Sequence, residues 1–505
     1  MKSKLNTLTK WLDKKRQPRT ILTALIILAA LFFFPIISAN VDYNDDTARN
    51  VMFGDAHSFA TNGRFVAEWI TQFLSGFNSP IMNFGQLGQI LGIVAVVAAV
   101  WLLLKRRLDY TAKSFLFVAP LIANPFLLEN VSYRYDALGM LIAYGLAISA
   151  FTFFSCTWKG IALSAGLLFV SFGIYQAMPT VTLGLALVWL AMTVFREKKI
   201  RNGILDTLGV TGAYAAGLIG YLIVHLLIPT ATNHTQLSAS LSAVRGNLGR
   251  LRDLLVEYLA GGFITPVLIA TIAVALVAAV LVIRQLKSRT IQILIAAAAL
   301  LLIPFVFLGP LILTPDTIIK PRVVPAFALI GVALAAPLLL VKRTKVVGVL
   351  LSMMLGLSLL VTIIFSFTHG AFVATQHEHR GVQMATVHSA LELSEIHGLV
   401  YVEGSTTDPR QIRKMREQYP ALSKYWSSSA TWASRVLADI RGNTATDWKA
   451  HYPEKTAAIC GGGAQPIVDA DKFAIFAVPG TDEHLVFLRP SHDVDYCSWA
   501  SKFQK

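Results

Sequence analysis

The stretch "ILTALIILAALFFFPIIS" (Ile21–Ser38) runs for eighteen residues without a charge. A helix needs about 20 mostly apolar residues to cross a bilayer, so this stretch predicts a membrane-spanning helix. Similar windows recur as far as Thr368, and only 14% of the 505 residues are charged, against roughly 25% in soluble domains. We therefore predict a polytopic α-helical membrane domain at 1–368 and a small soluble α/β domain at 369–505.

The apolar windows predict about eleven transmembrane helices, and we expect the first to be retained rather than cleaved as a signal peptide. The expected spans are 20–39, 86–104, 113–128, 135–155, 160–175, 178–195, 204–228, 263–283, 290–308, 323–341 and 346–368.

Basic residues gather in the short breaks between these windows, as in "KKRQPR" (Lys14–Arg19) and "REKKIR" (Arg196–Arg201). Cytoplasmic loops carry such an excess, which predicts a cytoplasmic N-terminus and, after an odd number of spans, an outer C-terminal domain. The net charge of +15 then reflects orientation in the membrane and argues against a nucleic-acid partner. Cys460 and Cys497 would lie in an oxidising compartment, where we expect a disulfide between them.

An acidic stretch follows the first span: "ANVDYNDDTARN" (Ala39–Asn50) contains Asp42, Asp45 and Asp46. Such residues also cap turns where a helix leaves the membrane, so the stretch alone leaves a structural role open. A functional role is favoured by basic residues predicted on the same outer face, where Lys and Arg are normally scarce. They are Arg49, Arg64, Arg134, Lys320 and Arg322.

Ion pairs with the aspartates would explain these cations, and so would a phosphate clamp, because Arg offers bidentate donors and Lys a point charge. Opposite such a clamp, a carboxylate could take the proton of an attacking sugar hydroxyl as a general base. The cations would stabilise the charge on the departing phosphate, and attack from the opposite face would invert the anomeric centre. We expect Asp45, Asp46 or Asp42 to supply the base.

Side chains suited to sugar contacts lie near the same face, although an interfacial aromatic belt would explain the aromatic ones equally well. These candidates are Tyr43, Trp69, Tyr133, Asp136, Tyr175 and Gln176. Trp69 belongs to an amphipathic stretch with Phe65, Phe73 and Phe77, which predicts a helix lying on the membrane surface.

No cofactor is expected. "HEH" (His377–His379) is more typical of a solvated surface than of a metal site, and no ligand spacing among the aspartates demands a divalent metal. The sequence also lacks the glycine-rich nucleotide-phosphate motifs, so neither a nucleotide-sugar donor nor ATP is indicated.

Several motifs of this chain resemble motifs of a known family and occur in the same order. "DYNDDTARNVMFGDAHSFATNGRFVAEWI" (Asp42–Ile70) resembles the first outer loop of the bacteriophage-type glucosyltransferases that convert serotype by modifying lipopolysaccharide O-antigen. The family pattern Tyr-x-Asp-Asp-x-x-Arg, followed by Gly-Arg, matches Tyr43, Asp45, Asp46, Arg49, Gly63 and Arg64. "NPFLLENVSYRYDALGM" (Asn124–Met140), "SFGIYQA" (Ser171–Ala177) and "KPRVVPAF" (Lys320–Phe327) are similar to later segments.

The resemblance implies a glycosyltransferase of the GT-C architecture in the bacterial inner membrane. It implies an undecaprenyl-phosphate-linked hexose, usually glucose, as donor, and a polysaccharide of the O-antigen type as periplasmic acceptor. Asp45 and Asp46 would be its acidic pair, one of them the base.

Two other functions stay open from the sequence. A flippase for lipid-linked sugars would place polar or broken-helix features near the bilayer midplane, whereas these helix interiors are almost free of charge. A scaffold that signals through the tail would not need so many spans.

Overall fold

A computed structural model describes residues 2–51, 59–77, 82–196, 200–228, 240–285, 290–314, 318–340, 345–426, 429–441, 445–447 and 452–503. The chain divides into two compact units. The first comprises Met1–Asn40, Ala56–Gly370 and Tyr419–Ala421, and the second comprises Val41–Asp55, Ala371–Gln418 and Leu422–Lys505.

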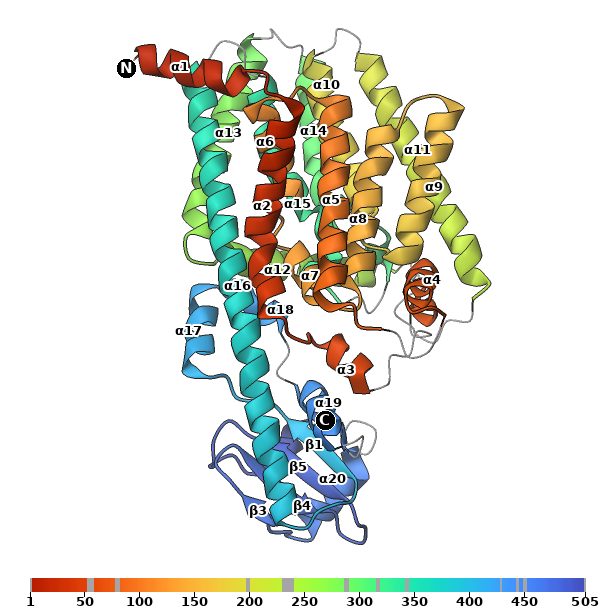
Figure 1. The fold of residues 1–505 in the computed structure, drawn as a ribbon, viewed down its shortest axis with the longest axis vertical. Helices are drawn as coiled ribbons and strands as arrows, with labels where there is room; N and C mark the ends of the chain where they lie inside the picture. The colour runs from red at the N-terminus through yellow and green to blue at the C-terminus, as the bar shows by residue number, and fades with distance from the viewer. Residues whose placement is uncertain are drawn as a thin grey trace. The chain divides into compact units, whose positions relative to one another are not determined.

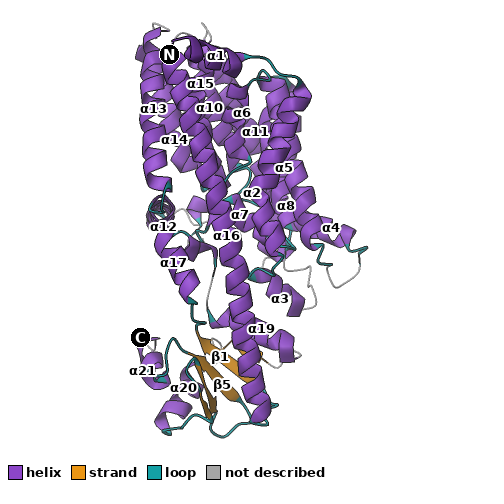
Figure 2. Cartoon of the chain, turned by 60° about the vertical axis from the view of Figure 1, so that its left-hand side comes forward, coloured by secondary structure: helices purple, strands orange, loops and turns teal. Residues whose placement is uncertain are grey.

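The first unit is built from helices, most of which run side by side (Figures 1 and 2). Its α-helices are α1 (Lys2–Asp13), α2 (Pro18–Ala39), α4 (Phe65–Leu74), α5 (Gly85–Arg107), α6 (Ala112–Val118), α7 (Leu127–Ser132), α8 (Ala137–Phe153), α9 (Trp158–Ile174), α10 (Thr180–Arg196), α11 (Ile200–Leu226), α12 (Leu241–Leu259), α13 (Ile264–Gln285), α14 (Thr290–Val306), α15 (Ala328–Leu340) and α16 (Lys345–Leu393) as far as Gly370. Its 3₁₀ turns are η2 (Ala60–Asn62), η3 (Ala119–Leu121), η5 (Gly309–Leu313), η6 (Pro321–Val323) and η7 (Pro325–Phe327).

Five described helices are long and apolar enough to cross a membrane: Pro18–Ala39, Gly85–Arg107, Ile200–Leu226, Ile264–Arg284 and Val346–Leu393. Six shorter apolar helices accompany them: Ala112–Leu121, Ala137–Phe153, Trp158–Ile174, Thr180–Phe195, Thr290–Val306 and Pro325–Leu340. By length and composition these are the helices of a membrane protein.

Local sequence sets the bounds of α2. Pro18 stands in its first turn, where a missing N–H costs nothing, and Asn40 closes its C-terminal end in the left-handed conformation (φ 47°).

Prolines interrupt two of the predicted spans. The window 113–128 is not one helix, because Pro120 and Pro125 lack a backbone donor: α6 ends at Val118, η3 follows, and α7 begins only at Leu127. The window 323–341 likewise starts with 3₁₀ turns at Pro321 and Pro325, and α15 begins at Ala328.

The expected domain boundary at 368/369 falls inside α16. No proline interrupts this helix, which continues to Leu393. At 1.5 Å per residue its 49 residues extend for about 73 Å, more than twice the thickness of a hydrocarbon core, so only part of it can lie in lipid. The division between the two units falls at Gly370 and Ala371.

The ends of the helix bundle in the first unit differ. In Figure 1, α1 lies across one end, and α4, α7 and α12 lie near the other. The α1 end carries basic residues in ion pairs, Lys15 with Asp109 (2.8 Å) and Lys113 with Asp13 (2.6 Å).

The second unit contains a five-stranded sheet in the order β2-β1-β5-β4-β3. Its strands are β1 (Val400–Gly404), β2 (Ala445–Asp447), β3 (Val468–Asp469), β4 (Phe473–Ala477) and β5 (His484–Leu488). Its helices are α3 (Asp45–Val51), the rest of α16, α17 (Arg410–Gln418), α18 (Leu422–Tyr425), α19 (Ala430–Arg441), α20 (Tyr452–Gly461) and α21 (Tyr496–Ala500), with the 3₁₀ turn η8 (Ser501–Phe503). β1 pairs in parallel with β2 and β5, whereas β4 pairs antiparallel with β5 and β3.

Strand alternation divides the sheet's side chains between two cores. In β1, Val400 and Val402 join a cluster with Leu437 of α19, whereas Tyr401 joins one with Ile459 of α20. A disulfide links Cys460 at the end of α20 to Cys497 in α21. The apolar segments "GLVYVEG" and "KFAIFAVPG", whose composition predicts buried strands, contain β1 and β4.

Candidate functional site

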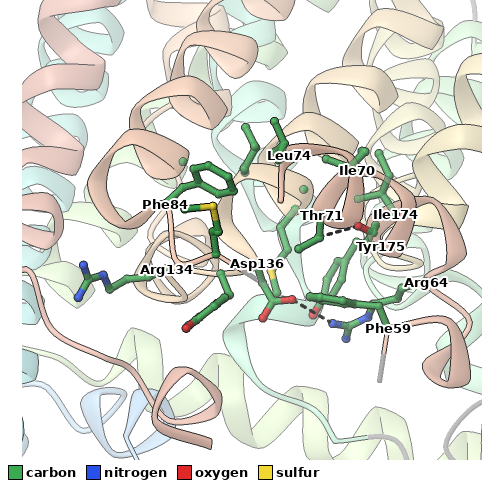
Figure 3. A pocket seen from close by; sticks show the side chains of 17 residues that line it. Phe59, Arg64, Ile70, Thr71, Leu74, Phe84, Arg134, Asp136, Ile174 and Tyr175 are labelled. Carbon is green, nitrogen blue, oxygen red and sulfur yellow. Dashed lines mark hydrogen bonds and ion pairs between the residues drawn. The ribbon is translucent and has the colours of Figure 1, made fainter. Parts of the chain in front are cut away.

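A pocket lies at the α4 end of the first unit (Figure 3). Its polar lining comes from Arg64 before α4, Thr71 on α4, Arg134 and Asp136 before α8, and Tyr175 after α9. The apolar side of α4 supplies Ala67, Ile70 and Leu74. The volume of this partly open pocket is about 20 Å³, room for about one water molecule.

Arg64 connects two other pocket residues. Its guanidinium carbon lies 4.5 Å from the ring centre of Tyr175, and Nη1 lies 4.0 Å from Oδ1 of the buried Asp136. Figure 3 shows Arg64 and Asp136 pointing toward one another, whereas Arg134 points to the opposite side. Arg64 and Asp136 thus form a cation–carboxylate pair beside a buried tyrosine.

The backbone before α4 explains why Gly63 precedes Arg64. Gly63 has a φ of 74°, and its N–H donates to the carbonyl of Ala60. A Cβ atom here would lie 2.6 Å from the Tyr221 hydroxyl oxygen and 2.9 Å from Nε2 of Gln176. Only glycine combines this conformation with such close neighbours, so the Gly-Arg pair places Arg64 at the pocket.

A second arginine is fixed by α7. The backbone N–H of Arg322 donates to Oε2 of buried Glu129 (2.8 Å), and Asn130 Nδ2 donates to the Arg322 carbonyl (3.2 Å). The Arg322 guanidinium donates to the Tyr133 hydroxyl, and its carbon lies 4.9 Å from that ring's centre. α7 thereby holds both the backbone and the side chain of Arg322.

Two arginines of the first unit each pack over a tyrosine ring, Arg64 over Tyr175 and Arg322 over Tyr133. Tyr175 lines the pocket and carries a hydroxyl group. This hydroxyl is buried and has no hydrogen-bond partner among the residues that the structure describes. The Arg64–Asp136 pair and a buried donor without a partner among the described residues thus share one pocket, and the Arg64 guanidinium can bind an anionic group.

Other predicted site residues have different roles or positions. Gln176 donates from Nε2 to the Asn62 carbonyl and the Tyr221 hydroxyl, both at 3.0 Å, and so supports the loop before α4. Trp69 does not line the pocket: it lies on α4 and is 68% exposed. Lys320 is half-buried and immediately precedes η6.

The acidic stretch belongs to the second unit, whereas the membrane domain predicted at 1–368 includes it. Asp46 is buried, and its Oδ2 accepts the backbone N–H of Tyr43 (3.0 Å), so it stabilises the turn that starts α3. Asp42 and Asp45 are half-buried, as is Arg49 in the last turn of α3. Tyr43, expected to contact sugar, is fully buried against Trp426, with ring centres 5.6 Å apart.

Several site residues escaped the sequence analysis. Tyr221 and His225 of α11 stack with ring centres 5.5 Å apart beside Gly63. Asn130 lies in a quoted motif, yet its role in holding Arg322 depends on a contact 192 positions along the chain. Polar side chains near the end of an otherwise apolar helix were the available signal for Tyr221 and His225.

A second cavity, of about 100 Å³, lies among α6, α13, α15 and α16 of the first unit. Its lining is mostly apolar, with Leu268, Phe327 and Leu355 among the residues. Thr271 and Ser358 share a hydrogen bond (2.9 Å) at its wall. Phe327, at the wall of this cavity, lies five positions after Arg322 along the chain.

No group of three His, Cys, Asp or Glu side chains able to hold a metal ion occurs among the described residues.

Comparison with known proteins identifies relatives. The model of a family described as "Glucosyl transferase GtrII" matches residues 34–333. A protein of Salmonella phage P22, described as an uncharacterized 55.3 kDa protein in the gtrB 5' region, is 28% identical over 207 residues. That match covers 40% of this chain and 41% of the phage protein, less than half of either. No solved structure matches the chain.

Proposed function

The chain belongs to the glucosyl transferase GtrII family, and from this premise we propose that it is an inverting glucosyltransferase of the GT-C type. The donor is glucose linked to undecaprenyl phosphate, and the acceptor is O-antigen or a related surface polysaccharide. The reaction takes place at the periplasmic face of the bacterial inner membrane.

The observation that carries this proposal is a pair of arginines held over buried tyrosine rings, Arg64 over Tyr175 and Arg322 over Tyr133. A sugar-phosphate donor needs cations that stabilise charge on the departing phosphate, and polar groups that hold sugar hydroxyls. Arg64 and Arg322 provide the cations, with Arg134, Lys320 and Arg49 as further candidates. Asp136, the Tyr175 hydroxyl and Tyr133 provide the polar groups for the sugar hydroxyls.

The proposed step conserves atoms and charge. An acceptor hydroxyl oxygen bonds to the anomeric carbon of glucose, while the bond from that carbon to the phosphate oxygen breaks. The hydroxyl proton goes to a carboxylate, and undecaprenyl phosphate leaves with the bonding electron pair. Attack opposite the leaving group inverts the anomeric centre.

We assign the base to the acidic stretch, and within it we favour Asp45. Asp46 is buried and accepts the Tyr43 N–H, which supports a structural role for its carboxylate. Asp45 is half-buried in the first turn of α3. A general base contributes about 10²–10⁴-fold, so its loss is measurable.

The second cavity supports a lipid-linked donor. Its apolar lining suits part of an isoprenoid chain, and Phe327 at its wall lies five positions after Arg322 in the sequence. The Cys460–Cys497 disulfide supports a periplasmic second unit, because disulfides persist in oxidising compartments. The lysines near α1, Lys15 and Lys113, support a cytoplasmic position for this end of the bundle.

The test is glucosyl transfer by the purified full chain, reconstituted with undecaprenyl-phosphate-linked glucose and lipid-linked O-antigen. We expect Asp45→Asn to lower kcat by about 10²–10⁴-fold and Arg64→Gln to raise the donor KM. Transfer in the wild type with an unchanged rate for Asp45→Asn would exclude this base but not the reaction. Movement of intact donor across the bilayer, without bond cleavage, would instead make the chain a flippase.

A further inference from the structure

We propose that Arg380 and Trp426 are positioning residues that clamp Tyr43 and thereby hold the acidic stretch in its working conformation. This proposal rests on the proposed function, because it requires a carboxylate of that stretch to act in transfer. All of the residues that carry it belong to the second unit. It gives that unit a direct part in the reaction.

The clamp is a stack of three side chains from distant parts of the chain. The guanidinium carbon of Arg380, on α16, lies 4.3 Å from the ring centre of Trp426. The ring of Tyr43 meets the same indole edge to face, with ring centres 5.6 Å apart and an interplanar angle of 72°. Arg380 and Trp426 are each 3% exposed, and Tyr43 is 0% exposed.

Burying a guanidinium is costly unless its surroundings replace water, so an arginine at this position requires an explanation. The face of an indole ring attracts a cation most strongly of the aromatic side chains, and the attraction grows once water is excluded. The planar guanidinium also stacks, which a lysine ammonium cannot do. Arg380 and Tyr43 thus both pack against the Trp426 indole.

Tyr43 transmits this restraint to the carboxylates through the backbone. Its N–H donates to Asp46 Oδ2 (3.0 Å), and its carbonyl accepts the N–H of Asp46 (2.9 Å). Asn44 between them has a φ of 40°, a left-handed conformation that asparagine adopts more readily than most residues. Fixing Tyr43 therefore fixes the start of α3 and the position of Asp45.

A second contact holds the far side of the stretch, because α3 packs against α19. α19 begins at Ala430, four positions after Trp426, so the clamp and this support come from neighbouring chain. The family match ends at residue 333, which leaves Arg380, Trp426 and α19 outside it. The clamp is therefore inferred from this chain's own contacts.

The experiment combines hydrogen exchange with steady-state kinetics on the full chain in lipid nanodiscs. Arg380→Lys keeps the charge and loses the stack. Trp426→Leu removes the ring, and Trp426→Phe keeps one. Arg489→Lys is the matched control, because Arg489 is also a buried arginine of the second unit (5% exposed) but binds Asp469 and the Ala470 carbonyl instead.

We expect Arg380→Lys and Trp426→Leu to speed amide exchange at 42–49 and to lower kcat by about 10–100-fold with an unchanged donor KM, since small misplacements of a reacting group have costs of this size. The kcat of Trp426→Phe should be at least tenfold higher than that of Trp426→Leu. Arg489→Lys should change neither the exchange at 42–49 nor kcat.

Wild-type exchange at 42–49 in both Arg380→Lys and Trp426→Leu would overturn the clamp. So would faster exchange there without any fall in kcat, provided that Asp45→Asn is impaired. If Asp45→Asn, Asp46→Asn and Asp42→Asn all retain full activity, the proposed base is wrong, while the exchange result still decides whether the clamp exists.

Discussion

A Cβ atom on Gly63 would stand 2.6 Å from the hydroxyl oxygen of Tyr221, closer than unbonded atoms of this kind approach. Gly63 also has a positive φ, so a larger residue is strained in two ways. The contact ties the loop that carries Arg64 to α11, far along the chain. It accounts physically for the glycine in a motif that the sequence shows only as a pattern.

Gly63→Ala is therefore expected to displace Arg64 and to lower kcat/KM by about 100-fold, a cost typical of a misplacement near 1 Å. Steady-state glucosyl transfer by purified protein measures this. The control is Gly166→Ala in α9, where an added Cβ meets nothing within 4 Å and alanine favours the helix. Equal activity of the two variants would contradict the role given to Gly63.

Tyr133→Phe removes the hydroxyl group that accepts a hydrogen bond from the Arg322 guanidinium. Hydrogen bonds to charged groups are worth about 1.5–3 kcal/mol, so we expect the donor KM to rise about tenfold or more while kcat changes less. Tyr144→Phe is the matched control, because Tyr144 is a buried tyrosine whose hydroxyl donates to the Leu121 carbonyl (3.0 Å) instead. A rise in KM for both variants would indicate general damage.

Leu268→Trp fills part of the apolar cavity beside Phe327. If the donor's isoprenoid chain enters there, excluding one or two of its methylenes raises KM by about 4–15-fold at about 0.8 kcal/mol each. A donor with a much shorter prenyl chain should be unaffected. The neighbouring Ile269 is 62% exposed, so Ile269→Trp tests the added indole alone. Identical behaviour of long and short donors would rule out this route.

His484 predicts how the stability of the second unit depends on pH. Burial lowers its pKa below 6.5 in the folded state, and nearby Arg441 lowers it further, although Asp482 opposes this. The unfolded state then binds more protons, so stability falls as pH drops through 6.5 toward the folded pKa. For one titrating group, the free energy of unfolding changes by at most about 1.4 kcal/mol per pH unit. Because the ring is partly exposed, we expect a smaller change.

Hydrogen exchange in β5 between pH 7.5 and 5 measures this effect. His484→Gln should flatten the dependence, whereas His397→Gln changes an exposed histidine of the same unit and should not. Asp469 does not contribute in this range, because the hydrogen bond from Arg489 lowers its pKa further below its ordinary value. An unchanged slope in His484→Gln would assign the dependence to other groups.

Local signals predicted much of this chain. The apolar run at 21–38, the buried apolar segments around Val400 and Phe473, and the amphipathic stretch at 65–74 all form the expected elements. The prolines that break 113–128 were visible, but the hydropathy of the window outweighed them. α16 continues beyond the expected domain boundary at 368/369, because the composition changes there without a helix-breaking residue.

The grouping of the site was harder to predict. Sequence order attached Asp45 and Asp46 to the first span, yet Tyr43 packs on Trp426, 383 positions later, and α3 packs on α19. Likewise, Arg322 is held by Glu129 and Asn130 through contacts that no local pattern encodes. Such contacts depend on tertiary packing, which overrides the neighbourhood along the chain.

The water-sized space between Arg64 and Arg134 has a consequence for turnover. If the proposed sugar binds here, the residues that line this pocket have to rearrange around it. One side of the pocket is α4, a ten-residue helix with Trp69 and Phe73 exposed on its outer surface, and a rearrangement of this helix would move both rings. Rate would then depend on how strongly lipid retains two aromatic rings, and membrane composition would become a control on glycan decoration.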